Sequence, residues 1–444
     1  MAVEKDTPGK KIRAAVPRTS QGDFKLSPQR PGVVESIRLS NQDRIKSLIP
    51  IRHDRMSVSP FAFYRGMAGL MAQDLSGLPH TQLKVQAIGD CHLCNFGGFA
   101  TPERTLIFDA NDFDETLPAA WEWDVKRLAT SFVLAARHNQ LRETDAHEMA
   151  IHMATSYRHS MYEFSQLPLL DLWYKKFEMH ALLNKATSEE VRALLRNAIE
   201  KAEKATPQQV FYKITQSVMG TFEITDQHPL IYHPLDLEKE KDNIKSFLSG
   251  YQRTLQEDRR FLFSKYHVVD VALKVVGVGS VGTRCMIALL MNDKDEPLFL
   301  QIKEARTSVL ENFTAKSKYK HAGERVVQGQ RLVQAASDIF LGWSTAGDGR
   351  HFYLRQLRDR KIVPDVETFD KEVLLAYAGL CGRMLARAHA KTGPGQQISD
   401  YMGKSELMDT AIGKFAVAYA DQTEKDFEVF TKAIRDGKLP VEKA

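Results

Sequence analysis

Cysteine is scarce in this sequence, and long apolar runs are missing from it. Four cysteines in 444 residues cannot supply the disulfide framework of a secreted scaffold, so a reducing cytoplasm is the expected location. No run approaches the roughly 18 consecutive apolar residues of a membrane-spanning helix. The first residues also lack the apolar core of about 7 to 15 residues that a secretory signal needs. These absences predict a cytoplasmic protein without a membrane partner.

A broad excess of positive charge is also missing from most of the chain. The net charge is +5, but residues 1–30 hold seven Lys or Arg against three acids, so the remainder is nearly neutral. Nucleic acid is therefore not expected as a partner, because its binding usually requires a basic face on the folded part. Residues 1–33 contain few large apolar side chains, and we predict that they form a disordered basic tail.

Acidic side chains gather where two short apolar stretches end. An alternating stretch over residues 83–87 leads into Asp90, and residues 106–108 lead into Asp109 and then Asp112. Both stretches have the pattern of strands, so the acids are expected at strand ends or turns. Side chains placed in this way converge on one site.

The spacing of these polar residues suits phosphoryl transfer. Asp90 can accept a proton from a hydroxyl, and five residues later Asn95 offers a carboxamide oxygen to a divalent cation. Asp112 adds the carboxylate that Mg²⁺ prefers, and Asp109 or Asp114 is a candidate for a second cation or a brace of the turn. A base and two metal ligands are the parts that such a reaction needs.

At these residues the sequence resembles known families. Residues 89–95, 111–114 and 123–129 resemble the catalytic loop, the metal-binding Asp-Phe segment and the following helix of aminoglycoside phosphotransferases and their protein-kinase-like relatives. Residues 59–66 and 111–116 resemble the uncharacterised bacterial domain of unknown function 2252 family, and that likeness runs from about Val34 to about Thr392. The resemblance implies a kinase-like fold that uses ATP and Mg²⁺.

The same resemblance assigns roles to neighbouring residues. His92 is expected to orient the catalytic loop or to contact phosphate, and Asp124 is expected to anchor the loop from the next helix. Ile88 departs from the pattern, because aminoglycoside phosphotransferases often have histidine there. Cys91 and Cys94 could instead form half of a zinc site or a redox pair, but no second pair of cysteines follows at similar spacing, and small loop residues are the simpler interpretation.

Arginines cluster around the expected start of a helix over residues 61–78, which Ser59 and Pro60 introduce. These arginines are Arg52, Arg55 and Arg65. They could bind phosphate or an acidic group of a substrate, or they could be solvated residues of a helix surface. The sequence leaves both interpretations open.

A glycine-rich segment lies far from the acids. Gly277, Gly279 and Gly282 form a G-x-G-x-x-G pattern, which is typical of a phosphate loop in kinases, of a dinucleotide-binding turn, or of a plain flexible turn. The kinase-like interpretation is favoured because the following apolar stretch reaches a polar turn after about ten residues, whereas a dinucleotide-binding unit needs a helix there.

A lysine and a glutamate follow this segment. Lys303 ends a predicted strand 21 residues after Gly282, where it could reach the phosphates of a nucleotide. Glu324 lies in the next predicted helix and is the expected carboxylate partner of Lys303. In ordinary kinases these elements precede the catalytic loop, whereas here they follow Asp90, so the order predicts a circularly permuted fold.

The sequence therefore predicts an α+β protein with a kinase-like two-lobe fold, in which a small antiparallel sheet lobe joins a larger helical lobe. Residues 34–264 form the helical catalytic lobe, residues 265–360 the nucleotide-binding sheet lobe, and residues 361–444 complete the helical lobe. The expected activity is transfer of a phosphoryl group from ATP to a hydroxyl of an unknown small-molecule or protein acceptor. A nucleotide-binding pseudokinase and an AMP-transferring enzyme are the alternatives.

Overall fold

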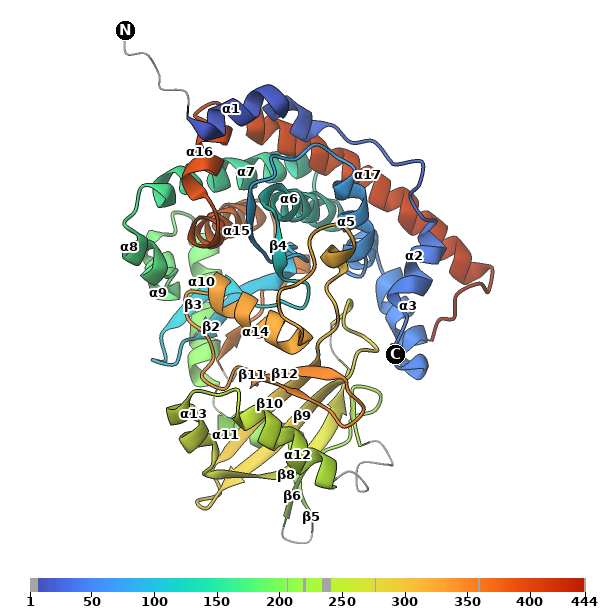
Figure 1. Ribbon diagram of the computed structural model, residues 1–444, viewed down its shortest axis with the longest axis vertical. Helices are drawn as coiled ribbons and strands as arrows, with labels where there is room; N and C mark the ends of the chain where they lie inside the picture. The colour runs from blue at the N-terminus through green and yellow to red at the C-terminus, as the bar shows by residue number, and fades with distance from the viewer. Residues whose placement is uncertain are drawn as a thin grey trace.

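The computed structural model of this protein describes residues 7–205, 207–218, 221–233, 241–275, 277–357 and 360–442. It has a mixed α+β structure (Figure 1), in agreement with the predicted fold class. Helices fill the upper part of Figure 1, and an antiparallel sheet with its own flanking helices fills the lower part.

Four long helices form the centre of the helical part. They are α6 (Trp121–His138), α7 (Glu143–Ser165), α15 (Lys371–Thr392) and α17 (Leu407–Arg435). α6 includes residues 123–129, where the resemblance led us to expect a helix. Acids in its first turn and Arg137 in its last turn favour the helix dipole. Every residue of α6 from Trp121 to Ala136 is buried, because α7, α15 and α17 pack around it.

Shorter helices surround this centre and flank the sheet. They are α1 (Pro8–Ala15), α2 (Val33–Ser40), α3 (Ile49–Ser57), α4 (Pro60–Arg65), α5 (Ala68–Ser76), α8 (Leu169–Tyr174), α9 (Met179–Lys185), α10 (Glu189–Lys204), α11 (Pro207–Ile214), α12 (Lys241–Gln252), α13 (Glu257–Phe263), α14 (Ala322–Val333) and α16 (Gly395–Met402).

The large sheet has six strands within the described residues, in the order β11-β12-β10-β9-β8-β7. All neighbouring strands are antiparallel. As the sequence predicts, the apolar stretch after Gly282 forms a strand that ends at a polar turn after Asn292, and Lys303 lies near the end of the next strand. The strands are β7 (Ile231–Tyr232), β8 (Tyr266–Lys274), β9 (Cys285–Asn292), β10 (Pro297–Glu304), β11 (Gly342–Thr345) and β12 (His351–Gln356).

Smaller sheets lie between the helical centre and the large sheet. β1 (Lys84–Ala87) pairs with β4 (Leu117–Ala120), and β2 (Phe96–Ala100) pairs with β3 (Leu106–Ala110) and β13 (Lys361–Ile362). β5 (Thr215–Val218) and β6 (Thr221–Ile224) form a separate hairpin. In Figure 1, β1 to β4 and α14 occupy the middle of the molecule. The acidic turns predicted after residues 87 and 108 therefore lie at the junction of the two parts.

The predicted disordered tail is wrong for the described residues from 7 onward. Residues 8–15 form α1, which packs on α16. Arg13 donates hydrogen bonds to the carbonyls of Asp400 and Tyr401, and Arg18 donates to the carbonyl of Met402 at 2.7 Å. These carbonyls end α16, where positive charge is favourable. Arg13 and Arg18 thus cap another helix instead of being solvated.

The helix predicted over residues 61–78 is divided into α4 and α5. Ser59 caps α4 by accepting a hydrogen bond from the backbone nitrogen of Ala62 at 3.1 Å. The helix ends at Arg65, and Gly66 follows at a close approach to α3, where an added Cβ would lie 2.8 Å from the sulfur of Met56. The break leaves Arg65 at the end of a short helix.

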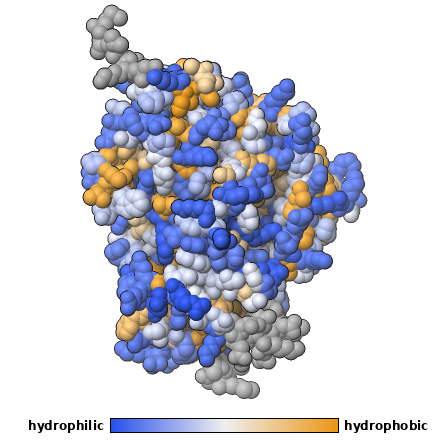
Figure 2. Space-filling view, in the orientation of Figure 1, coloured by the Kyte–Doolittle hydropathy of each residue, from blue (hydrophilic) through white to orange (hydrophobic). Residues whose placement is uncertain are grey.

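The surface in Figure 2 is mostly hydrophilic, with hydrophobic residues at the edge where α8 lies. The exposed apolar side chains of α8 include Leu169 and Leu170. None of the helices in the described ranges combines the length and the apolar character that a membrane crossing requires.

Candidate active site

The turn that carries Asp90 is held from behind by a buried carboxylate. Asp124 of α6 accepts hydrogen bonds from the backbone nitrogens of Ile88 at 2.7 Å and Gly89 at 3.0 Å. Gly89 has a φ of 87°, and an added Cβ would lie 2.5 Å from the carbonyl oxygen of Glu115, so only glycine fits there. Asp124 thus makes the contacts that its expected anchoring role requires.

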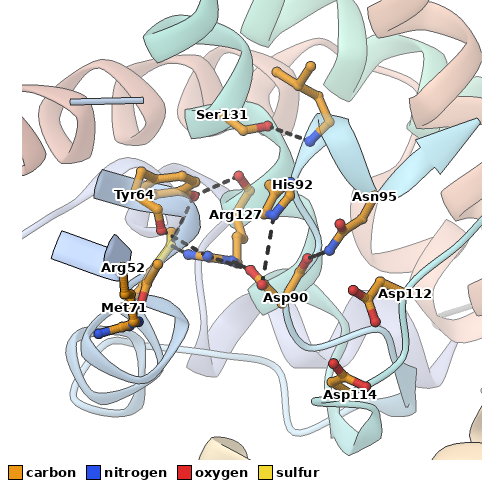
Figure 3. Close-up of polar contacts among 12 residues, drawn as sticks. Arg52, Tyr64, Met71, Asp90, His92, Asn95, Asp112, Asp114, Arg127 and Ser131 are labelled. Carbon is orange, nitrogen blue, oxygen red and sulfur yellow. Dashed lines mark hydrogen bonds and ion pairs between the residues drawn. The ribbon is translucent and has the colours of Figure 1, made fainter. Parts of the chain in front are cut away.

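Asp90 lies beside α6, with 24% of its side chain exposed (Figure 3). The Nε of Arg127 donates to Oδ1 of Asp90 at 2.7 Å, and the Nδ2 of Asn95 donates to its main-chain oxygen at 2.7 Å. Burial raises the pKa of the Asp90 carboxyl, while the Arg127 guanidinium opposes that rise. Within the described chain Oδ2 of Asp90 accepts no hydrogen bond, so this oxygen is available to take up a proton.

His92 is buried next to Asp90. Its Nε2 lies 3.7 Å from Oδ2 of Asp90, and its Nδ1 has no hydrogen-bond partner among the described residues. Burial, followed by the charges of Arg65 and Arg127, holds the pKa of His92 well below its ordinary value of 6.5. The imidazole is therefore neutral near pH 7, which suits a role in orienting the loop better than an ionic contact with phosphate.

The large sheet presents Lys303 to the acidic turn after β3. Lys303 lies on β10 opposite Tyr353 of β12. Its Nζ is 2.7 Å from Oδ2 of Asp114 and 3.3 Å from Oδ1 of Asp112, and the Tyr353 hydroxyl donates to Oδ1 of Asp114 at 2.7 Å. Burial disfavours the charge on Lys303, but both carboxylates outweigh it and raise its pKa. Groups separated by 189 and 191 positions in the chain thus meet in one place.

Asp112 and Asn95 offer oxygen atoms that fit a magnesium ion. Burial opposes ionisation of Asp112, but the charges of Lys303 and Arg355 outweigh it, so the pKa of Asp112 is below its ordinary value of 3.8. Neither Oδ2 of Asp112 nor Oδ1 of Asn95 accepts a hydrogen bond from the described residues. Figure 3 shows Asp112 between Asn95 and Asp114. These hard oxygen donors suit Mg²⁺.

The protein alone would not complete the coordination of such an ion. No group of three His, Cys, Asp or Glu side chains that could hold a metal occurs in the described part of the chain. Asp114, the candidate for a second cation, already uses one oxygen to accept from Tyr353 and the other to pair with Lys303. A magnesium ion here would take its remaining ligands from phosphate groups and water, as it commonly does.

Asp109 does not belong to this set, and we withdraw it as a metal ligand. Its side chain is 1% exposed and lies in β3, where Oδ1 accepts a hydrogen bond from Arg387 of α15 at 2.7 Å. Oδ2 accepts from the backbone nitrogen of Ala335 at 2.9 Å. Both oxygens are therefore used inside the protein, away from solvent.

The predicted pairing of Lys303 with Glu324 is wrong. Glu324 lies in the first turn of α14 and forms no ion pair with Lys303 in the described structure, where the lysine instead contacts the acids after β3. The next residue, Arg325, is buried and donates to the carbonyls of Asp114 and Thr116 at 2.7 Å each. The orientation of α14 therefore turns Arg325, and not Glu324, toward the acidic turn.

The glycine-rich segment joins β8 to the antiparallel strand β9. This excludes a dinucleotide-binding unit, which needs a helix after the glycines. Gly277 and Gly282 have φ values of 63° and 86°, which favour glycine. Arg55 donates to the carbonyl of Gly277 at 2.6 Å, and the backbone nitrogen of Ile45 donates to that of Gly282 at 2.8 Å. A Cβ on Gly279 would come within 3.2 Å of the end of α4, so the segment lies against the N-terminal helices.

Sequence reasoning missed four residues around the acids. Arg127 and Tyr353 donate to the carboxylates of Asp90 and Asp114. Arg325 and Arg355 donate to main-chain carbonyls of the acidic turn. Arg127 carried a usable signal, because it follows the anchoring Asp124 by three positions and therefore lies on the same face of α6. Tyr353 and Arg355 lie on the same face of β12 by the alternation of strand side chains. No local pattern indicated Arg325.

The cysteines near Asp90 are packed thiols. All four cysteines of the chain are free, and Cys91 is buried. Burial raises the pKa of the Cys91 thiol well above its ordinary value, which disfavours the reactive thiolate. The interpretation of Cys91 and Cys94 as small loop residues fits this environment better than a redox pair does.

A large cavity of about 1070 Å³ lies elsewhere, beside β8, α12 and α13. Its lining includes Glu223, His233, Lys245, Tyr266 and Asp270, and contains none of the predicted site residues. The candidate site is thus defined by its polar contacts and not by the size of a cavity.

Together these features define a mixed α+β protein whose single predicted site lies where a helical part meets an antiparallel sheet. The chain belongs to the family described as "Uncharacterized protein conserved in bacteria (DUF2252)", whose model matches residues 44–433. The expected membership is confirmed, and the match extends into α17. No curated protein and no solved structure matches the chain.

Proposed function

We propose that this protein is an ATP- and Mg²⁺-dependent phosphotransferase that moves a phosphoryl group to a hydroxyl of a small-molecule or protein acceptor. One observation carries the proposal. Lys303 of the large sheet contacts Asp112 and Asp114 of the turn after β3, which is joined through β2 to the loop of Asp90 and Asn95. Phosphoryl transfer needs a phosphate-binding lysine, a metal-binding acid and a base at one place.

The order of elements supports a kinase-like fold. β8, the glycine-rich segment, β9, β10 with Lys303, α14 and two further strands follow one another as in the nucleotide-binding lobe of kinases. The acids come from residues earlier in the chain, which a circular permutation explains. In such a fold α15 would correspond to the helix that precedes the catalytic loop in aminoglycoside kinases. Its His389 supports this correspondence, because it lies 3.2 Å from Asp124, the residue that anchors the turn of Asp90.

In this mechanism Oδ2 of Asp90 takes the proton of the acceptor hydroxyl as the hydroxyl oxygen attacks phosphorus. Arg127 fixes the position of the Asp90 carboxylate and favours its ionised form. Lys303 binds phosphate oxygens of the nucleotide, and Asn95 and Asp112 would hold Mg²⁺. The ion would neutralise charge on the phosphates.

The proposal is tested by label transfer from γ-labelled ATP with Mg²⁺ and a cell extract as the source of acceptor. Asp112→Asn should lower transfer by about a hundredfold or more, because it removes a charged ligand. The melting temperature should stay close to that of the parent protein. Glu324→Gln is the matched control, because Glu324 lies outside the site, and it should retain transfer. Full transfer by Asp112→Asn would rule out the assignment.

A nucleotide-binding pseudokinase is the second candidate. It is favoured by the engagement of Asp90 with buried Arg127 and of Lys303 with both acids, since these ion pairs neutralise the reactive groups. This candidate predicts that Mg·ATP raises the melting temperature while no labelled product forms. Label transfer from α-labelled ATP would instead indicate movement of AMP.

A further inference from the structure

The three arginines around α3 and α4 differ in their partners. Arg52 is fully buried and donates to the side chain of Asn41 at 2.7 Å and to the carbonyl of Gly66 at 2.8 Å. Arg55 donates to the carbonyl of Gly277 at 2.6 Å. These two residues therefore hold the N-terminal helices and the glycine-rich segment in place.

The side chain of Arg65 does not hold other segments in place in this way. It forms neither a hydrogen bond nor an ion pair with its side chain in the described chain, and its Nε is buried without a partner. Its guanidinium carbon lies 5.8 Å from the centre of the Phe61 ring. Asp90 is not its partner either, because the ion pairs of Asp90 in the described chain are with Arg127 and His92. A buried donor without a protein acceptor requires an explanation.

The surroundings of Arg65 place it between the two halves of the candidate site. Its carbonyl oxygen lies 3.2 Å from the position of a Cβ on Gly279, so its backbone touches the glycine-rich segment. The positive charge of Arg65 also acts electrostatically on residues of the turn that carries Asp90. Burial raises the pKa of Asp90 and lowers that of His92, and in both cases the positive charge of Arg65 acts to lower the pKa.

We propose that the guanidinium of Arg65 binds the phosphoryl group that is transferred, at the point between Gly279 and Asp90. This inference rests on the proposed function. In the step, the acceptor oxygen forms a bond to the γ-phosphorus, and the bond from that phosphorus to the β,γ-bridging oxygen breaks. The electron pair leaves with ADP, the acceptor proton moves to Asp90, and Arg65 donates hydrogen bonds to the non-bridging oxygens.

An acidic group on the acceptor is a weaker candidate for the partner of Arg65. In a kinase-like site the glycine-rich segment covers the phosphates of the nucleotide and the base faces the acceptor. The transferred phosphoryl group is the one part of the reactants that must lie between them. Arginine suits this position because its planar fork can donate to two phosphate oxygens at once, which the single ammonium of lysine cannot do in the same geometry.

The experiment compares dissociation constants for Mg·ADP and for Mg²⁺ with the β,γ-imido analogue of ATP, measured by calorimetry. The parent protein should bind the analogue more tightly than ADP. Arg65→Ala should weaken binding of the analogue by about tenfold to a hundredfold, as expected for a lost charged hydrogen bond, and leave the affinity for ADP unchanged. Arg65→Lys should keep part of the preference, and it replaces the alanine variant if that variant does not fold.

Arg192→Ala is the control, because Arg192 pairs with Glu189 on the surface of α10, and it should bind both nucleotides like the parent protein. Equal weakening of both nucleotides by Arg65→Ala, or no weakening of either, would overturn the role of Arg65 while leaving the proposed function standing. If Arg65→Ala does not fold, either of these two outcomes measured with a folded Arg65→Lys variant would overturn the role of Arg65. Failure of the parent protein to bind either nucleotide would overturn the proposed function, and this inference with it.

Discussion

Asp109 and Asp112 are three positions apart, yet only Asp112 faces the polar site. Asp109 lies within β3 and is 1% exposed, whereas Asp112 follows the end of that strand and keeps 34% of its side chain exposed. Strand geometry fixes the direction in which the Asp109 side chain points, whereas Asp112 lies in the turn, where the alternation of strand side chains no longer applies. Residue type and spacing identify a group of acids, but the end of the strand decides which acid is available for binding.

The buried pair of Asp109 with Arg387 gives a prediction at this scale. Arg387→Met should lower the free energy of unfolding by about 3 to 5 kcal/mol, because it leaves a buried carboxylate without its cation. Urea denaturation measures the change. The double variant Asp109→Asn with Arg387→Met should recover part of the loss, since it removes the isolated charge. A single variant as stable as the parent protein would show that Asp109 does not depend on Arg387.

At the scale of elements, α1 shows where composition misleads. The segment is polar and basic, and eight residues are too few for a stable isolated helix. Its order depends on α16, against which Gly9 packs so closely that a Cβ would lie 2.3 Å from the carbonyl oxygen of Gln397. The sequence places these contacts nearly 390 positions apart, so no local pattern could have indicated them.

The caps on α16 can be tested directly. The double variant Arg13→Gln with Arg18→Gln should lower the free energy of unfolding by about 1 to 3 kcal/mol, because it removes charged hydrogen bonds to the carbonyls that end α16. Lys11→Gln is the matched control. Lys11 is exposed on α1, and its substitution should change stability by less than about 0.5 kcal/mol. Equal stability of the double variant and the control, measured in the same denaturant series, would contradict these caps and support the prediction of a disordered tail.

At the scale of the whole molecule, the sequence predicted what depends on local periodicity. β10, which carries Lys303, and the apolar stretch of β9 after Gly282 both follow from short apolar patterns. The predicted pairing of Glu324 with Lys303 was wrong, because it depends on how α14 is rotated against a turn some 210 positions away in the chain, and this rotation directs Arg325 to that turn. The meeting of Lys303 with the acids was expected from the resemblance, and not from any pattern within either segment.

That meeting leads to a prediction about the complete fold. If one nucleotide contacts both parts, Mg·ATP should slow amide hydrogen exchange together in residues 88–95 and 277–284, because ligand binding suppresses local opening of the backbone it contacts. α10, which lies outside the site, is the internal reference. Its amides should exchange at the same rate in the presence of Mg·ATP as in the presence of Mg²⁺ alone. Slower exchange in residues 277–284 without any change in residues 88–95 would mean that the nucleotide binds to the sheet alone. The acids of the helical part would then have no share in its recognition, and the kinase-like arrangement would fail.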